Sequence, residues 1–116
     1  MSERLTAGQK AALHTKEARN GLCLFMQFPG VDASTYEAVL EKLDLRGPNP
    51  DWPKGFISHI AGFVSDGLCV VDVWQSRKDF EDFVEDRLRP AFEDFGGLPQ
   101  PNITAFEVHN TLRLEV

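Results

Sequence analysis

Cysteine is scarce in this sequence, and long apolar runs are missing from it. The two cysteines, Cys23 and Cys69, cannot build a disulfide framework, and we expect both to be reduced core residues. No apolar run approaches the roughly 20 residues that span a bilayer. Residues 1–9 contain no apolar segment of the kind that signal peptides carry. We therefore expect a cytoplasmic protein that does not contact a membrane.

Basic residues are outnumbered, and the common phosphate-binding and nucleophile motifs are absent. The chain has 12 Lys and Arg against 18 Asp and Glu, a formal net charge of −6, and no block of basic residues. Binding to nucleic-acid phosphates needs such a block, so no nucleic-acid partner is expected. The sequence contains no Gly-x-Ser-x-Gly, P-loop or Gly-x-Gly-x-x-Gly motif. Histidine and cysteine never occur at metal-ligand spacing, so we predict no metal site and no cofactor.

The length of 116 residues suits one folded domain, preceded by an arm. Residues 1–20 predict a helical arm whose apolar side chains are mostly alanines. Such a helix has little to bury, so we expect it to dock loosely or to contact another subunit. Residues 21–116 are predicted to form the folded domain.

Strand and helix signals alternate along this domain. Four apolar runs are typical of strands: residues 22–28, 56–64, 68–75 and 102–108. One helix is predicted to begin at a capping box at Ser34, and a second at a capping box at Ser76. Pro90 predicts a kink or break in the second helix. The order βαββαβ predicts an α+β, ferredoxin-like domain, with an antiparallel sheet of order 4-1-3-2 and both helices on one face.

The predicted strands are apolar on both faces, whereas two helices cover only one face. The other face needs a cover, and a second copy of the same sheet supplies one directly. We therefore predict a homodimer whose sheets pack face to face.

The Asp66-Gly67 pair between two apolar runs predicts a hairpin with a type I′ turn. This turn would place His59 opposite Trp74 and diagonal to Asp72. One face of the hairpin would then carry all of its ionisable strand residues. The predicted members of that face are Ile57, His59, Ala61, Phe63, Leu68, Val70, Asp72 and Trp74. Phe56 would lie on the other, drier face.

The pairing of His59 with Asp72 has two interpretations. The two side chains can satisfy each other inside the structure and do nothing more. Alternatively, they line a pocket in which Asp72 orients the imidazole, His59 acts as general base and Trp74 forms an apolar wall.

Further candidate residues lie on the helices and loops. Arg87 falls on the apolar face of the second helix, where it pairs internally with Asp72 or Glu107 or binds a substrate carboxylate or enolate. Trp52, in the proline-rich loop of residues 46–55, either fills a hydrophobic gap or covers a ligand. Tyr36 and His109 are further candidates for binding the substrate, although His109 should lie ~14 Å from His59 across the sheet.

The segment Val70–Ser76, followed by Phe80 and Phe83, resembles the antibiotic biosynthesis monooxygenase group of the dimeric α/β-barrel superfamily. The segments His59–Gly62, Asp86–Pro90 and Val108–Asn110 are similar to small bacterial proteins of this kind. The likeness of element order extends from Gly21 to about Leu112.

This resemblance implies a homodimer with a pocket between sheet and helices. Some members of the group oxidise aromatic polyketides with O₂ and no metal or flavin, and others degrade haem with an Asn, Trp and His set. Trp74 matches the tryptophan of that set. Residues 22–28 contain no asparagine and residues 77–95 contain no histidine, so haem degradation is not expected.

Two functions follow as hypotheses. The first is a cofactor-independent monooxygenase or isomerase acting on a small aromatic or enolisable compound, with His59, Asp72 and Arg87 as catalytic residues and Trp74 in the substrate site. The second is a non-catalytic homodimer that binds a small molecule or is purely structural. A cavity of ~300 Å³ or more beside Trp74 would favour the first.

Overall fold

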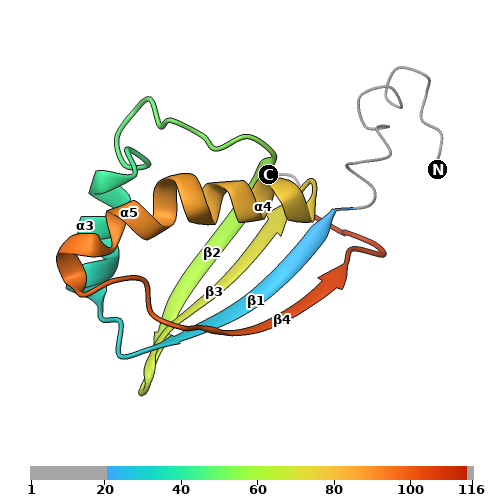
Figure 1. Cartoon of the computed structure of the whole chain (residues 1–116). Coiled ribbons are helices and arrows are strands. Elements are labelled where there is room, and N and C mark those ends of the chain that lie inside the picture. The colour runs from blue at the N-terminus through green and yellow to red at the C-terminus, as the bar shows by residue number, and fades with distance from the viewer. Residues whose placement is uncertain (1–20, 115–116) are drawn as a thin grey trace.

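The computed structural model describes residues 21–114, which form a four-stranded antiparallel sheet with helices on one face (Figure 1). The main elements are β1 (Leu22–Pro29), α3 (Ala33–Lys42), β2 (Phe56–Val64), β3 (Gly67–Trp74), α4 (Arg77–Phe83), α5 (Arg89–Ala91) and β4 (Asn102–Glu107). The strand order β2-β3-β1-β4 confirms the predicted ferredoxin-like α+β fold. The predicted arm of residues 1–20 lies outside the described residues.

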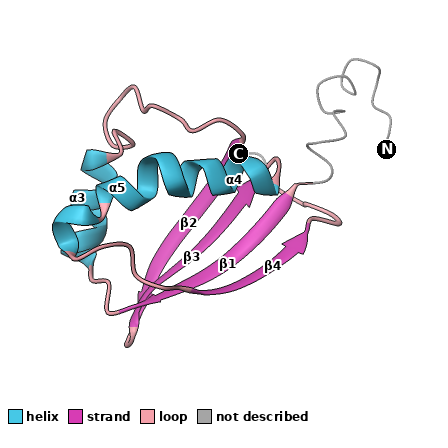
Figure 2. Ribbon diagram, viewed as in Figure 1, coloured by secondary structure: helices cyan, strands magenta, loops and turns pink. Residues whose placement is uncertain are grey.

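The core lies between the helices and the two central strands, β1 and β3 (Figure 2). Alternate residues of these strands point at the helices and are buried, as the period of two in a strand requires. The sheet contributes Leu22, Leu24, Met26, Phe28, Leu68, Val70 and Trp74 to this core. The helical side contributes Val39, Leu43, Phe80, Ala91 and Phe92.

Within residues 21–114, no helix covers the other face of the sheet, which is rich in apolar side chains. Phe25, Ile60, Val64 and Phe106 project from this face and are between 38% and 68% exposed. We call these four residues the open-face cluster. The exposed apolar side chains on this face follow from the sequence pattern, in which the strands are apolar on both faces.

The β2–β3 hairpin turns one residue earlier than the sequence predicted. Val64 pairs with Gly67, which leaves Ser65 and Asp66 as the connecting residues. This connection is not a type I′ turn, which requires positive φ at both connecting residues. Within residues 21–114, Asp44 is the only non-glycine residue with positive φ. Gly67 is needed for a different reason. Its φ is +147°, and a side chain there would overlap the carbonyl oxygen of Phe28.

The earlier turn shifts the register by two residues, so that His59 pairs with Asp72 and not with Trp74. A shift of two preserves the face on which each side chain lies, whereas a shift of one would have reversed it. The predicted gathering of His59, Asp72 and Trp74 on the helix-facing side is therefore retained.

A β-bulge at the start of β2 corrects a second detail of this face. Phe56 pairs with Trp74 and Ser58 with Val73, so Ile57 is the extra residue between them. The bulge moves Phe56 to the helix-facing side, where it packs edge-on against Trp74. Ile57, which was predicted on that side, is 42% exposed.

Each of the two long helices begins at a side-chain cap, and the sequence predicted one of the two caps correctly. The predicted start of α3 at Ser34 is wrong, because the Asp32 side chain accepts the cap hydrogen bond from the backbone N–H of Thr35. The predicted start of α4 at Ser76 is confirmed: its Oγ accepts from the backbone N–H of Asp79 at 3.1 Å. In both cases a short polar side chain satisfies an otherwise unpaired N–H of the first turn.

Pro90 does not interrupt the second helix, which runs continuously from Arg77 to Ala91 (Figure 1). The turn before it, Val84–Leu88, is a π-helix in which the Arg89 N–H bonds to the Val84 carbonyl, five residues back. A wider turn relieves the clash that a proline ring makes with the carbonyl four residues earlier. None of the helices in residues 21–114 is long and apolar enough to cross a membrane.

Replacing Ser76 with alanine should lower the free energy of unfolding by about 1 kcal/mol, because the N–H of Asp79 loses its acceptor. Ser34→Ala is the matched control, since Ser34 donates to Asp32 but caps nothing, and it should change stability by less than about 0.5 kcal/mol. Urea unfolding followed by circular dichroism measures both. Equal losses in the two variants would contradict the assignment of Ser76 as the cap.

Candidate functional site

Asp72 is the only buried charged or polar side chain in the part of the chain that the structure describes, with 5% of its surface exposed. A buried carboxylate needs hydrogen-bond donors to offset the loss of hydration. Asp72 has two of them. Its Oδ1 lies 2.6 Å from Nδ1 of His59, and its Oδ2 accepts from the indole N–H of Trp74 at 3.1 Å.

The chain of hydrogen bonds continues from His59 to Tyr36 on α3, whose hydroxyl oxygen lies 2.7 Å from Nε2 of His59. An ionised Asp72 can only accept, so Nδ1 of His59 must carry a proton. In neutral imidazole Nε2 is then the acceptor, and Tyr36 donates to it. We call the sequence Tyr36–His59–Asp72–Trp74 the relay.

Tyr36 remains a hydroxyl donor within this arrangement. Burial raises the pKa of its phenol, and the negative charges of Glu37 and Asp72 raise it further. The Tyr36 ring also packs edge-on against Phe63 on β2, with ring centroids 6.1 Å apart. The raised pKa keeps the proton on the Tyr36 hydroxyl, and the contact with Phe63 orients the ring.

An apolar cavity of about 270 Å³ lies against the relay, between the sheet and the helices. Its volume falls slightly below the ~300 Å³ that was taken to favour an enzyme, and all four relay residues border it. The rest of the wall is aliphatic and aromatic, and Trp74 is surrounded there by Phe56, Phe80 and Phe83 at centroid distances of 5.2 to 5.7 Å. Within residues 21–114, no lysine or arginine lines this cavity.

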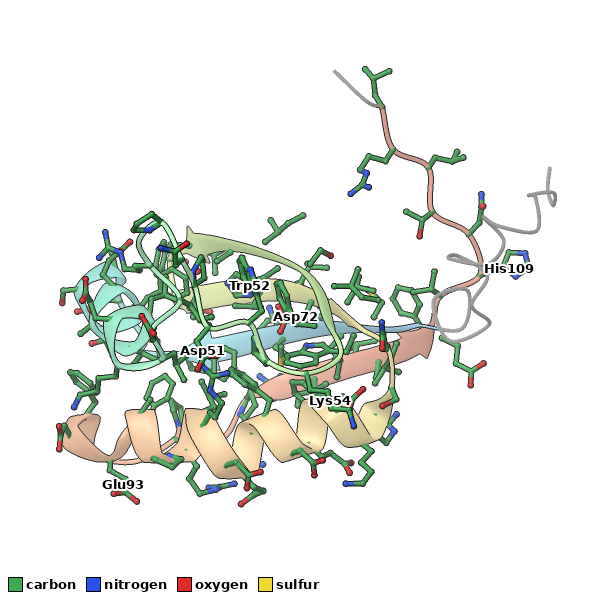
Figure 3. All side chains as sticks on the ribbon, turned by 90° about the horizontal axis from the view of Figure 1, so that it is seen from above. Asp51, Trp52, Lys54, Asp72, Glu93 and His109 are labelled. Atoms are coloured by element: carbon green, nitrogen blue, oxygen red, sulfur yellow. The ribbon has the colours of Figure 1, made fainter. Side chains whose placement is uncertain are left out.

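Trp52 lies at the edge of the cavity on the loop of residues 46–55 (Figure 3). It is 59% exposed, too much for a side chain that fills a hydrophobic gap. Its indole stacks on Phe56 with an interplanar angle of 3° and a centroid distance of 5.2 Å. Of the two interpretations of Trp52, this geometry favours a cover over the cavity.

Arg87 is not part of the relay and does not line the cavity. Its Nη2 donates to the backbone carbonyl of Leu43 at 2.7 Å and lies 3.5 Å from Asp51, and its guanidinium lies over the ring of Phe83. It therefore fastens the end of α3 and the Trp52 loop to the second helix. The predicted internal partners, Asp72 and Glu107, are not those observed, and the predicted role with substrate has no geometric support.

His109 lies beyond the end of β4, exposed and apart from Asp72 and Trp52 (Figure 3). The structure therefore does not bring it to the cavity with the other candidate residues.

No group of three or more His, Cys, Asp or Glu in residues 21–114 is arranged to hold a metal ion. Cys23 is buried, and burial raises the pKa of its thiol. The negative charge of Asp72 raises this pKa further, so that a nucleophilic thiolate is disfavoured.

The sequence did not predict the Tyr36–His59 hydrogen bond, because Tyr36 was considered only as a candidate for binding the substrate. Alternation along the hairpin can place two strand residues together, but it does not locate a helix above them. The available signal was the position of Tyr36 in the first turns of a helix that leaves the end of β1, directly beside the hairpin.

Comparison with known proteins supports the fold. No family model and no curated protein matches the sequence. The structure of NE2512, a protein of unknown function from Nitrosomonas europaea, is similar with a TM-score of 0.60 and 17% identity, over 84% of this chain and 98% of that one. A monooxygenase from the gene ActVA-Orf6 of Streptomyces coelicolor, in complex with nanaomycin D, aligns with a TM-score of 0.48 and 18% identity, over 83% and 93% of the two chains. At such identities the Nitrosomonas structure shows a shared fold, and any activity has to be argued from the residues of this chain.

Arg87→Met should loosen the Trp52 loop, because the stem is kept while both polar contacts are lost. Loss of about 1 kcal/mol from local stability raises the open population about fivefold. Trypsin cleavage after Lys54, followed by mass spectrometry, should accelerate by that factor. Arg89→Met is the matched control, since Arg89 pairs with Glu85 on its own helix. Equal cleavage rates in the two variants would show that Arg87 does not hold the loop.

Proposed function

We propose that this chain is a cofactor-independent monooxygenase that acts on a small aromatic or enolisable compound. The observation that carries the proposal is the relay: a buried carboxylate orients an imidazole whose other nitrogen is hydrogen-bonded to Tyr36 at the wall of an apolar cavity. This is the arrangement that general-base catalysis requires. The sequence resemblance to the antibiotic biosynthesis monooxygenase group supports the same class of reaction.

The relay supplies the proton transfer, and O₂ supplies the oxidation. Removal of a proton from an activated CH₂ group leaves a resonance-stabilised carbanion, and the proton passes to Nε2 of His59. The negative charge of Asp72 stabilises the imidazolium that forms. The carbanion and O₂ combine to give a peroxide, which takes the proton back. Loss of water from this hydroperoxide leaves a carbonyl, so one oxygen atom enters the product and the other enters water.

The cavity wall suits such a substrate. The rings of Trp52, Phe56, Trp74 and Phe83 offer flat apolar surfaces on which an aromatic compound can stack. A water-poor wall also strengthens the electrostatic interaction between His59 and Asp72. The volume of about 270 Å³ favours a ligand of one or two fused rings.

His59→Ala should lower the rate of oxygen consumption about 100-fold on a panel of hydroquinones, naphthols and anthrones, because the base is lost. An oxygen electrode measures the rate and mass spectrometry identifies the carbonyl product. Ser58→Ala is the matched control, since Ser58 neighbours His59 but lies on the opposite face of β2, and it should keep the wild-type rate. An unchanged rate in His59→Ala would remove His59 from the mechanism.

A non-catalytic binding protein is the second candidate, and one observation favours it. Nε2 of His59 already accepts from Tyr36, so the relay is satisfied without a substrate. Binding of the same compounds with no oxygen consumption in the wild-type protein would favour this function over the first.

We propose further that the chain is a homodimer joined through the open-face cluster. Exposed apolar side chains gathered on a sheet face that no other element of residues 21–114 covers mark an interaction surface, and the family resemblance implies a second copy as the partner. This pairing would remove Phe25, Ile60, Val64 and Phe106 from water. The cavity lies on the other side of the sheet, so the proposal does not depend on the catalytic one.

Ile60→Asp should convert the dimer to a monomer, because it places a charge within the proposed apolar interface. Ile60 is 68% exposed in the single chain, so the variant should still fold. Light scattering coupled to size exclusion measures the mass. Ile103→Asp is the control, since Ile103 is exposed on the opposite face of the same sheet. A wild-type monomer at micromolar concentration would refute the dimer.

A further inference from the structure

The donors and acceptors of the relay follow one another in a fixed order, and this order determines whether the cavity wall offers a ligand a hydrogen-bond donor or an acceptor. Asp72 accepts two hydrogen bonds, one from the indole N–H of Trp74 and one from Nδ1–H of His59. The hydroxyl group of Tyr36 donates a third to Nε2 of His59. Each of these three donor groups in the wall is therefore already used when the imidazole is neutral. The remaining indole N–H belongs to Trp52, which is largely exposed at the edge and can be satisfied by water.

The atom left for a ligand is the hydroxyl oxygen of Tyr36. Because its proton is already used in the hydrogen bond to His59, this oxygen has only lone pairs to offer a ligand and can only accept. A ligand carbonyl or carboxylate placed there would meet another acceptor. The absence of lysine and arginine from the cavity wall within residues 21–114 further disfavours an anion, because nothing offsets the loss of its hydration.

We propose that the cavity selects uncharged, planar compounds carrying an O–H or N–H donor, and that Tyr36 is the catalytic residue which receives this hydrogen bond. The inference rests on the proposed function and assigns its substrate class and first proton acceptor. The ligand proton moves to the Tyr36 oxygen while the Tyr36 proton moves to Nε2 of His59. The products of this double transfer are a ligand anion, a neutral tyrosine and an imidazolium beside the Asp72 carboxylate. No oxidant takes part in this step.

The direction of the relay can be reversed by one isosteric substitution. In Asp72→Asn, the amide oxygen must face the indole N–H of Trp74, because two donors cannot face each other. The amide nitrogen then donates to Nδ1 of His59, which moves the imidazole proton to Nε2. Nε2 now donates to Tyr36, and the Tyr36 hydroxyl proton is free to point into the cavity. The Tyr36 hydroxyl group at the cavity wall thereby changes from a hydrogen-bond acceptor to a hydrogen-bond donor.

Calorimetric titration with three naphthalene probes tests this selection, without O₂ and at about pH 8, above the ordinary titration range of imidazole. The wild-type protein should bind 2-naphthol about tenfold more tightly than 2-methoxynaphthalene, and 2-naphthoate more weakly than either. Asp72→Asn should reverse the first preference. Tyr36→Phe should bind 2-naphthol about tenfold more weakly than the wild-type protein does, because the Nε2 acceptor that it uncovers lies 2.7 Å beyond the lost hydroxyl oxygen. Circular dichroism verifies that each variant is folded.

The outcomes separate this inference from the proposed function. Equal binding of naphthol and ether by the wild-type protein overturns the donor selection, even if oxygen is consumed on other substrates. Unchanged affinity for 2-naphthol in Tyr36→Phe overturns the assignment of Tyr36, since the contact in the wild-type protein would then be His59 itself. A preference that reverses in folded Asp72→Asn supports the inference, even if no substrate is oxidised and the monooxygenase proposal fails.

Discussion

The arrangement of the site depends on one buried carboxylate and the two N–H groups that satisfy it. Asp72 points from a central strand into the core, where an unpaired charge would be costly. Its hydrogen bonds to His59 and Trp74 offset that cost and fix the orientation of both rings. The position of the imidazole proton, and the direction in which Tyr36 donates, follow from this single contact. The hydrogen-bonding character of the cavity wall is thus set by Asp72 through the residues that it orients.

The two faces of the sheet have separate tasks because the strands alternate. The residues that face the helices build the core and the cavity, whereas those on the other side form the open-face cluster. The helical layer closes the cavity in two ways: α3 brings Tyr36 to His59, and Arg87 on the second helix fastens the end of α3 and the Trp52 loop. The site is therefore assembled from a strand pair, two helices and a loop, of which only the strand pair is contiguous in sequence.

Much of this fold could be predicted from apolar runs and turn residues, and the errors have physical causes. The strand order and the gathering of His59, Asp72 and Trp74 were predicted correctly even though the hairpin register was wrong by two residues, because an even shift preserves the faces. The bulge that moves Phe56 inward has no local signal, since both Phe56 and Ile57 are apolar. The partners of Arg87 and the hydrogen bond from Tyr36 depend on how helices and a loop settle on the sheet, which no periodicity specifies.

The π-helical turn before Pro90 makes the second helix tolerant of a change in chain length. A π turn accommodates one residue more than an α turn while leaving the flanking segments in phase. Removing one residue between positions 84 and 88, together with replacing Pro90, whose ring would otherwise clash with the carbonyl four residues earlier, would let that stretch close into ordinary α-helix with Phe80 and Phe92 still directed at the core. The same deletion within α4 would rotate everything before it by about 100° and carry Phe80 away from Trp74. The middle of this helix, and not its beginning, is thus where homologous sequences of different length can differ without loss of the cavity.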